Sequence, residues 1–313
     1  MAGIDIAIIG AGLAGLACAR ALREAGRSPV LFDKSRGVGG RLSTRRAEGG
    51  LRFDHGAQFV TALKAGFSAV LRDAQMAGRA APWDSGSADH CIVGTPGMNN
   101  IAKHMAEGLD IWLGVAASTI SPEADGWRIE TNGGTWTSRR VVLAVPAPQA
   151  VKILGKAHPL AQDIAKVQMA PCLALMASFE AGTEVPFQSR RDPGGAIDWI
   201  ALNSSKPDRW GPPSWVAHAS SAWSLENLEL PPEQIAGLML PMLCDRLGVD
   251  PSSARHVAAH RWRYARVTDP LGVPFARNEA GTLYAGGDWC LGARAEYAWE
   301  SGTAIAQDIL GTD

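Results

Sequence analysis

Residues 5–41 constrain the fold of this chain more strongly than any other stretch. An apolar run ends at Gly10, and the apolar side chains that follow recur at helical spacing from Leu13 to Leu22. A second apolar run, residues 29–32, is closed by Asp33. An apolar run bounded by glycine is typical of a strand buried on both faces. The stretch therefore predicts a strand, a tight turn, a helix and a second strand.

The three glycines of this stretch have separate tasks. Gly10 makes the turn, Gly12 lets the backbone approach a pyrophosphate, and Gly15 allows the helix to pack closely on the strand. A phosphate then lies on the free N–H groups at the helix start. Asp33 stands where a carboxylate accepts the hydroxyl protons of an adenosine ribose. The motif predicts dinucleotide binding, and a turn that binds no phosphate is the alternative.

The loop after Asp33 narrows the choice of dinucleotide. It carries Lys34, Gly40 and Arg41 among further glycines and arginines, whereas an NAD-only dehydrogenase normally runs straight into its next helix. The loop resembles the second fingerprint of FAD enzymes of the amine-oxidase superfamily, in which the arginine at the Arg41 position meets the flavin pyrophosphate. This resemblance implies non-covalent FAD, and attachment through Cys290 is the less favoured alternative.

Composition excludes several other classes of function. Lys plus Arg number 30 and Asp plus Glu 31, so no global basic field is present to hold nucleic acid or an anionic membrane. The five cysteines are scattered and lack CxxC spacing, which indicates reduced thiols and neither a disulfide framework nor a metal site. The N-terminal apolar stretch lacks a cationic segment, so we expect a cytoplasmic protein rather than an exported one.

Residues 51–60 read as a short strand that ends in Gly56, Ala57 and Gln58. Such a sequence suggests backbone passing close to a flat ring, with the Gln58 amide offered to the flavin or a ligand; a turn with an exposed glutamine is the alternative. Residues 62–80 have helical spacing and are expected to cover a second domain. The turn at 93–100, which contains Thr95 and Pro96, is either a helix cap or a ligand contact.

The middle of the chain changes from nucleotide-domain patterns to a second sheet. Strands are expected at 111–120, 126–131 and 135–145, the last returning to the first sheet as a parallel strand. Alternating segments at 172–180, 197–203, 215–220 and 256–263, with a helix at 232–247, predict an antiparallel sheet with one covered face. Such a sheet commonly forms a roof over a ring-shaped substrate.

Histidines and aromatic residues mark this predicted roof. His218 and His260 are each either core residues with satisfied hydrogen bonds or functional groups. The run of His260, Trp262 and Tyr264, with arginines between them, could clasp an anionic aromatic ligand.

The last segment returns to the nucleotide domain. A strand ends at Gly287 and Asp288, and a helix that contains Glu296 runs to Leu310. In FAD enzymes such an acid accepts a ribityl hydroxyl, and the helix start stabilises negative charge on the reduced ring. We therefore predict an α/β fold, a Rossmann-like FAD-binding domain with an inserted α+β substrate domain built on an antiparallel sheet. The expected bounds are 1–61, 93–148 and 275–313 for the FAD-binding domain and 62–92 and 149–274 for the substrate domain.

Taken together, these motifs resemble the renalase-like branch of the flavin amine-oxidase superfamily, whose fold is similar to that of p-hydroxybenzoate hydroxylase. The matching segments are residues 8–16, 31–41, 56–58, 198–201, 205–207, 260–266 and 287–291. The resemblance implies an oxidase that takes hydride from dihydro isomers of NAD(P) reduced at ring position 2 or 6, giving NAD(P)+ and, with O2, hydrogen peroxide. Orientation of the ring would then be the chief catalytic task.

The resemblance and the motifs together assign candidate residues. The substrate-positioning candidates are Gln58, Phe59, Thr95, Pro96, Asn203, His218, His260, Trp262, Tyr264 and Arg294. The cofactor-binding candidates are Gly10, Gly12, Leu13, Ala14, Gly15, Asp33, Lys34, Gly40, Arg41, Gly56, Ala57, Gln58, Ala117, Gly287, Asp288, Glu296, Tyr297 and Ala298.

Two departures from the family pattern leave the identity of the substrate open, and two other functions are considered beside the first. The family has a tyrosine and an arginine where this chain has Phe59 and Leu63, so a hydroxyl and a cation are missing. An oxidase of a small amine is the second hypothesis; such sites commonly place a lysine near the flavin, but Lys206 occupies a Ser-Ser-Lys-Pro turn that is expected to be exposed. A redox-silent FAD-binding scaffold is the third hypothesis.

Overall fold

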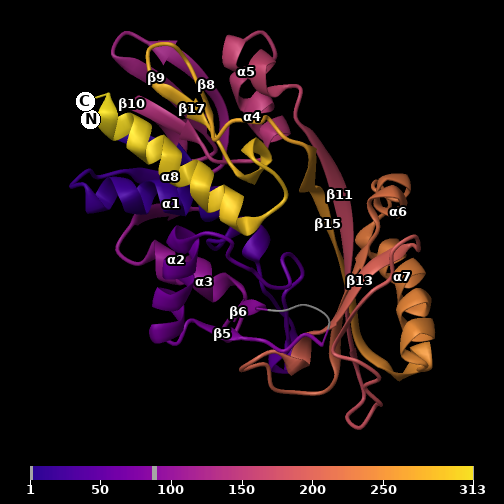
Figure 1. The fold of residues 1–313 in the computed structure, drawn as a ribbon. Helices are drawn as coiled ribbons and strands as arrows, with labels where there is room; N and C mark the ends of the chain where they lie inside the picture. The colour runs from indigo at the N-terminus through magenta and orange to yellow at the C-terminus, as the bar shows by residue number, and fades with distance from the viewer. Residues whose placement is uncertain (1–2, 87–89, 313) are drawn as a thin grey trace.

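The computed structural model describes residues 3–86 and 90–312, and Figure 1 shows two main sheets in two separate layers. Residues 1–2, 87–89 and 313, which belong to the expected domain segments, lie outside the described residues. The predicted fold class is confirmed: a mostly parallel sheet and a purely antiparallel sheet share the chain. The expected domain bounds remain a proposal.

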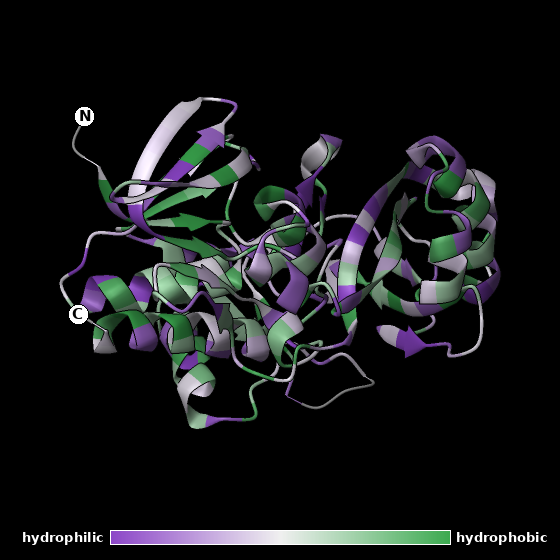
Figure 2. Ribbon diagram, turned by 90° about the horizontal axis from the view of Figure 1, so that it is seen from above, coloured by the Kyte–Doolittle hydropathy of each residue, from purple (hydrophilic) through white to green (hydrophobic). Residues whose placement is uncertain are grey.

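The first sheet has eight strands in the order β16-β17-β10-β1-β2-β7, with β9 on the free part of β10 and β8 on β9. The strands from β17 to β7 are parallel, and Ile8 of β1 lies between Val142 of β10 and Leu31 of β2. Figure 2 shows apolar residues concentrated in these central strands. The strand bounds are Ile4–Ile9 (β1), Val30–Asp33 (β2), Asp110–Leu113 (β7), Ala117–Glu123 (β8), Gly126–Thr131 (β9), Gly134–Leu143 (β10), Ala276–Arg277 (β16) and Leu283–Ala285 (β17).

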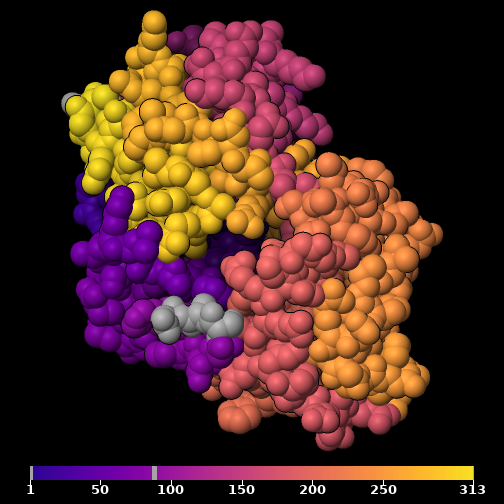
Figure 3. Space-filling model, turned by 45° about the vertical axis from the view of Figure 1, so that its right-hand side comes forward, coloured from indigo at the N-terminus to yellow at the C-terminus, as the bar shows by residue number. Residues whose placement is uncertain are grey.

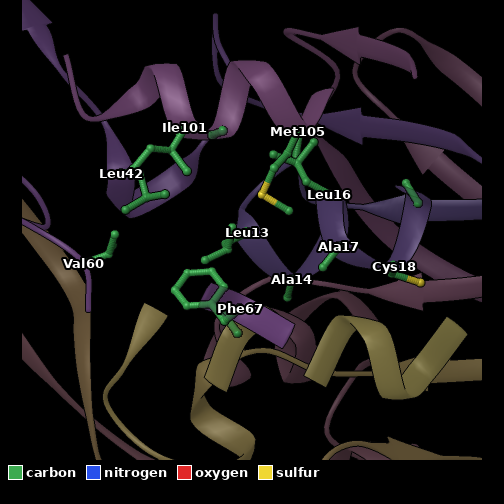
Figure 4. Packing of buried hydrophobic residues seen from close by; sticks show 14 of the residues in the cluster. Leu13, Ala14, Leu16, Ala17, Cys18, Leu42, Val60, Phe67, Ile101 and Met105 are labelled. Atoms are coloured by element: carbon green, nitrogen blue, oxygen red, sulfur yellow. The ribbon is translucent and has the colours of Figure 1, made fainter. Parts of the chain in front are cut away.

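Alternate residues of these strands face two hydrophobic clusters. One face packs against α1 (Leu13–Glu24), α2 (Ala65–Met76), α3 (Asn99–Ala106) and α8 (Ala295–Gly311), and Figure 4 shows how Leu13, Phe67 and Ile101 from three of these helices join in one cluster. The other face is covered by the β8-β9 hairpin, α4 (Ala147–Leu154) and α5 (Pro159–Ile164). Helix α2 contacts β5, α3 and α8, and its cluster also contains Trp199 and Ala201 of the second sheet.

The second sheet has five antiparallel strands in the order β12-β13-β14-β11-β15. Its outer face carries Leu175, Trp215 and Ala259 and packs against α7. Its inner face turns toward the layers of the first sheet (Figure 1). The bounds are Gln168–Phe179 (β11), Ser189–Arg191 (β12), Ile197–Leu202 (β13), Ser214–Ala219 (β14), Ala254–Asp269 (β15), Ser221–Glu226 (α6) and Pro232–Leu247 (α7).

Short elements connect the two layers. The ribbon of β3 (Arg45–Arg46) and β4 (Arg52–Phe53) contacts β14, and β5 (Ala80–Pro82) pairs with β6 (Ile92–Gly94). The 3-10 turns are Gly40–Leu42 (η1), Glu48–Gly50 (η2), Asn203–Ser205 (η3), Pro251–Ser253 (η4) and Asp288–Cys290 (η5). No helix within the described residues is long and apolar enough to cross a membrane.

Two predicted strands differ from the structure. The single strand expected at residues 111–120 is two strands, β7 and β8, because the backbone turns at Gly114, where φ is 76°. The strand expected at residues 256–263 extends from Ala254 to Asp269, since it pairs along its length with β11. The helix expected at residues 232–247 has those same bounds in the structure.

Candidate functional site

The carboxyl ends of β17, β10, β1 and β2 meet at one edge of the eight-stranded sheet. The chain passes from β1 to β2 on one side, whereas β10 and β17 lie on the other, so the strand order reverses between β1 and β10. Open parallel sheets bind ligands in the crevice at such a reversal. Figure 3 shows a hollow bordered by the yellow, purple and salmon segments, with indigo atoms of the N-terminal segment at its base.

The glycine turn after β1 leaves room for a ligand only at its middle glycine. Gly10 has φ 111°, donates its N–H to Phe32 O at 2.8 Å, and would bring a Cβ within 2.5 Å of Ala144 O. A Cβ on Gly15 would lie 1.9 Å from Gly10 O, whereas one on Gly12 would meet no described atom within 4 Å. No side chain of the described residues caps α1, so the N–H groups of its first turn face this open side.

This difference predicts that alanine at Gly12 affects FAD binding, whereas alanine at Gly15 affects the stability of the fold. Gly12→Ala should leave the melting temperature of the flavin-free protein unchanged but weaken FAD binding at least about tenfold, because its methyl group occupies the approach to the helix start. Gly15→Ala should instead destabilise the fold by about 2 kcal/mol, since its methyl group collides with backbone. Thermal unfolding and FAD titration measure the two effects. Equal loss of stability in both variants would contradict the assignment.

Asp33 closes β2 beside the glycine turn. Its two carboxylate oxygens accept the N–H groups of Ala11 and Ser35, each at 2.7 Å. Lys34 next to it is exposed, and the half-buried Ala117 begins β8 close by, since Val115 donates its N–H to Asp33 O at 2.9 Å. Each carboxylate oxygen has a further lone pair, so Asp33 can join the turn to the loop and still accept a ribose hydroxyl.

Arg41 and Asp288 come together although 247 residues separate them. The Arg41 guanidinium donates to both oxygens of Asp288, at 2.8 and 2.5 Å, and to Ala265 O at 2.9 Å. Gly40 beside it has φ 53° and lies against Gly12, since a Cβ there would be 3.5 Å from Gly12 Cα. The two residues expected to meet the pyrophosphate and the ribityl chain therefore hold the loop of η1 against the start of η5.

The backbone of residues 54–58 passes between the two sheets, and we call this segment the floor. Ala57 donates its N–H to Arg41 O at 2.8 Å, and a Cβ on Gly56 would lie 2.1 Å from that same oxygen and 3.3 Å from the ring of Trp262. The Trp262 indole donates to His55 O at 2.8 Å. This segment is therefore fixed between the glycine-rich loop and the roof strand β15, and its passage close to a flat ring stays a prediction.

Gln58 is 6 % exposed, and its amide is committed to the protein. Its Nε2 donates to Asp54 O and, at 3.2 Å, to Gly56 O, while its Oε1 accepts from Lys206 Nζ at 3.1 Å. The structure thus places Gln58 as a brace for residues 54–58, rather than with its amide directed at a ligand.

A buried ionic group lies behind this brace. The Asp54 carboxylate accepts from Lys206 Nζ at 3.1 Å and from Arg209 Nη2 at 2.6 Å, and also from Thr44 Oγ1 at 2.7 Å and Met98 N at 3.0 Å. Burial alone would raise the pKa of Asp54, but the two cations hold it at about 2. Burial lowers the pKa of Lys206 to about 8 against the attraction of Asp54. We call Asp54, Lys206 and Arg209 the buried triad.

The expectation that Lys206 is exposed is wrong. The Ser-Ser-Lys-Pro turn is η3 and the residues after it, and it directs the lysine inward, where the residue is 2 % exposed. The turn tolerates this burial because Asp54 and Gln58 both accept hydrogen bonds from the ammonium group. The lysine also lies 5.2 Å from the ring of Trp83.

Aromatic and histidine rings lie on the inner face of the five-stranded sheet, which we call the roof. The centroid of the His55 ring lies 4.6 Å from that of His260 and 5.2 Å from that of Trp262, and Phe59 lies 5.9 Å from Trp199. Burial lowers the pKa of His55 to about 3, that of His218 to about 4, and also that of His260. These histidines are therefore neutral at pH 7, and the roof presents an uncharged aromatic surface.

Other expected substrate residues lie apart from these rings. Thr95 donates its hydroxyl to Gly78 O at 2.9 Å, and Pro96 lines a separate cavity. Asn203 is fully buried and joins Asp54 N to Arg52 O, at 3.1 and 2.6 Å. These side chains are thus occupied within the protein.

The start of α8 borders the site from the C-terminal segment. Arg294 donates to Thr61 Oγ1 at 2.7 Å, and the buried Glu296 accepts the N–H groups of Leu63 and Lys64 at 2.8 to 3.1 Å. No side chain within the described ranges caps this helix. Two expected cofactor residues, Tyr297 and Ala298, lie in its first turn, and Tyr264 is half-buried on β15.

Comparison with known proteins assigns the family. A family model described as flavin containing amine oxidoreductase matches residues 83–310, and one described as an NAD(P)-binding Rossmann-like domain matches residues 8–73. The chain belongs to the flavin containing amine oxidoreductase family. A putative protoporphyrinogen oxidase from Exiguobacterium sp. 255-15 has a similar fold, with TM-score 0.80, 13% identity and 100% of each chain covered. Wild-type putrescine oxidase bound to putrescine is also similar, with TM-score 0.72, 16% identity and 99% of each chain covered.

The cofactor of this amine oxidoreductase is FAD, and its residues fit that molecule. The open side of Gly12 and the uncapped start of α1 suit a pyrophosphate, and the start of α8 and the loop at Arg41 and Asp288 lie on the same edge of the sheet. FAD supplies a hydride acceptor when bound. Within the described residues, no group of three His, Cys, Asp or Glu side chains could hold a metal ion.

Sequence reasoning about this amine oxidoreductase gave no role to Asp54, His55, Trp199 or Arg209. The available signal was that Asp54 and His55 directly follow Phe53 in a predicted strand. A charged residue at a buried strand position needs a partner, so these two residues indicated partners elsewhere in the chain. Their partners lie about 150 residues away in the chain, so no local pattern identifies them.

Proposed function

We propose that this FAD-dependent amine oxidoreductase belongs to the renalase-like branch and oxidises dihydronicotinamide dinucleotides reduced at ring position 2 or 6. The products are NAD(P)+ and, with O2, hydrogen peroxide, and the cytoplasm is the proposed location. The neutral, ring-lined roof opposite the glycine-rich floor is the observation that carries this proposal.

The neutral roof suits a donor that needs no deprotonation. A dihydropyridine already holds the electron pair that it gives up, so the protein must orient the ring and exclude water. Trp262, fixed to His55 O, and Trp199, in contact with Phe59, are two indoles of the roof that can contact a flat heterocycle. The buried Nε1 of Trp199 has no hydrogen-bond partner in the described part of the chain and would suit a carboxamide oxygen.

Charge at the edge of the roof supports an anionic dinucleotide. The exposed Arg191 lies with its guanidinium carbon 5.2 Å from the ring of Trp199. A guanidinium held on an indole can bind phosphate oxygens while the indole contacts a heterocycle. One side of the proposed ring site is thus cationic.

Oxidation of a small amine is the second candidate, and the burial of Lys206 favours it. The expected exposure of this lysine was the argument against that reaction, and the structure removes it. However, Lys206 Nζ already donates to Asp54 and Gln58, so its hydrogen bonds are directed to the protein. The lysine therefore supports the floor rather than contacting a substrate directly.

Anaerobic reduction of the bound flavin separates the candidates. Isomers made by treating NAD+ with borohydride should bleach the flavin absorbance, while ordinary NADH and putrescine should not. Readmitting O2 should restore the absorbance and yield hydrogen peroxide. Bleaching by the amine alone would overturn the proposal in favour of an amine oxidase, and bleaching by neither would leave a redox-silent scaffold.

A further inference from the structure

A second cavity lies apart from the glycine turns and the roof rings. Its volume is about 360 Å³, and none of the three glycines of the turn after β1 lines it. We call it the η3 pocket, and it is lined by Gly50, Leu51, Arg52, Pro96, Ser204, Asp208, Arg209, Trp210 and Ser214. Its volume is within the range of small-molecule sites.

The wall of the η3 pocket carries excess positive charge. Arg209 lines it and belongs to the buried triad, in which the carboxylate of Asp54 faces two cations. Arg52 lines it as well and has no ion-pair partner within residues 3–86 and 90–312. Asp208 is the acidic residue of the lining, and it is exposed at the rim.

The surface beside the pocket adds to this charge. Burial lowers the pKa of Lys103, and the nearby Arg46, Arg52 and Arg79 lower it further. Of these, Arg79 is paired with Glu107 at 3.4 Å, whereas Arg46 and Lys103 have no carboxylate partner in the described ranges. Several like charges held together favour an anionic ligand.

A large flat side chain stands at the mouth of the pocket. Trp210 is 85 % exposed, on a loop in which Asp208 has φ 59° and Gly211 has φ 131°. A tryptophan so exposed beside a cavity is available for stacking against a planar ring. Guanidinium groups in the wall and an indole at the rim are the complements of a phosphate and of a base, respectively.

We infer that the η3 pocket binds a nucleoside monophosphate, with the phosphate on Arg52, in the field of the buried Arg209 behind it, and the base on Trp210. This site is separate from the proposed oxidase site and does not depend on the substrate of that reaction. Arg209 connects the two regions, because its partner Asp54 also holds Lys206, which braces Gln58. The ligand would offset the uncompensated positive charge of the triad.

Calorimetric titration of the FAD-loaded enzyme with AMP tests the inference, because the flavin then blocks the dinucleotide cradle. AMP should bind to one site, and adenosine and inorganic phosphate at least about tenfold more weakly. Arg52→Ala and Trp210→Ala should each weaken AMP binding at least about tenfold. Arg139→Ala, an exposed arginine on β10, and Trp112→Ala, a half-exposed tryptophan on β7, should leave it unchanged.

Two results would overturn the site. One is absence of AMP binding at about 5 mM. The other is binding that Arg52→Ala and Trp210→Ala both leave intact, which would place AMP at the substrate site instead. Neither measurement involves turnover, so failure of the proposed oxidase reaction would be seen separately. Flavin content, read from the absorbance of each variant, verifies that the variants remain folded.

Discussion

Asp54→Asn should lower the free energy of unfolding by about 4 kcal/mol, because it leaves two buried cations beside a neutral amide. Lys206 and Arg209 are both almost fully buried, so neither can turn to water without moving the η3 turn. Urea denaturation followed by circular dichroism measures the change. Glu229→Gln, which removes an exposed partner of Arg261 and Arg263, is the matched control and should change stability little.

Lys206→Met should cost less stability than Asp54→Asn, since it leaves Asp54 paired with Arg209 at 2.6 Å. The pH dependence gives a second check. The pKa of Asp54 is lowered from 3.8 to about 2 in the folded protein, so its stabilisation is present above pH 4 and is lost as the pH falls toward 2. The difference between Asp54→Asn and the wild type should narrow over that interval. Superimposable unfolding curves at pH 7 would contradict the role of the triad.

Arg41→Met should give a protein that folds but is purified almost without flavin. Arg41 joins the η1 loop to Asp288 with two hydrogen bonds and to Ala265 O with a third, so its loss frees the η1 loop from the start of η5. We expect the dissociation constant of FAD to rise at least about 100-fold. Absorbance in the flavin band and titration of flavin fluorescence measure this change.

Two further variants test whether the paired geometry of Arg41 matters. Arg41→Lys keeps the charge but not the planar fork, so its FAD affinity should fall between those of Arg41→Met and the wild type. Arg36→Met removes an exposed arginine from the same loop and should retain its flavin. Full flavin content in Arg41→Met would show that the pair with Asp288 is not needed for binding.

Sequence patterns predicted the parts of this fold whose cause is local. The glycine at position 15 is required by contact with Gly10 O, and the alternation over residues 197–203 follows from one covered sheet face. The superfamily and the FAD cofactor followed from the glycine turn and the glycine-rich loop after Asp33. The break between β7 and β8 was missed because Gly114 lies inside an otherwise strand-like run.

The candidate site was less predictable because its polar residues depend on distant partners. Gln58 was expected to face a ligand, yet its amide oxygen accepts a hydrogen bond from Lys206, 148 residues later. The sequence places Lys206 in a turn and predicts that it is exposed. It is buried because its ammonium group donates a hydrogen bond to Asp54. Asn203 and Thr95 are likewise occupied by backbone groups of other segments.

Strand β17 and helix α8, near the end of the chain, complete the layers that begin with β1 and α1. Strand β17 extends the parallel sheet beside β10, and α8 lies so close to α1 that a Cβ on Gly302 would be 2.0 Å from Ala14 O. Residues 283–311 must therefore be synthesised before β17 and α8 can pack beside the glycine turn at Gly10. We therefore expect a chain truncated before residue 283 to bind FAD weakly.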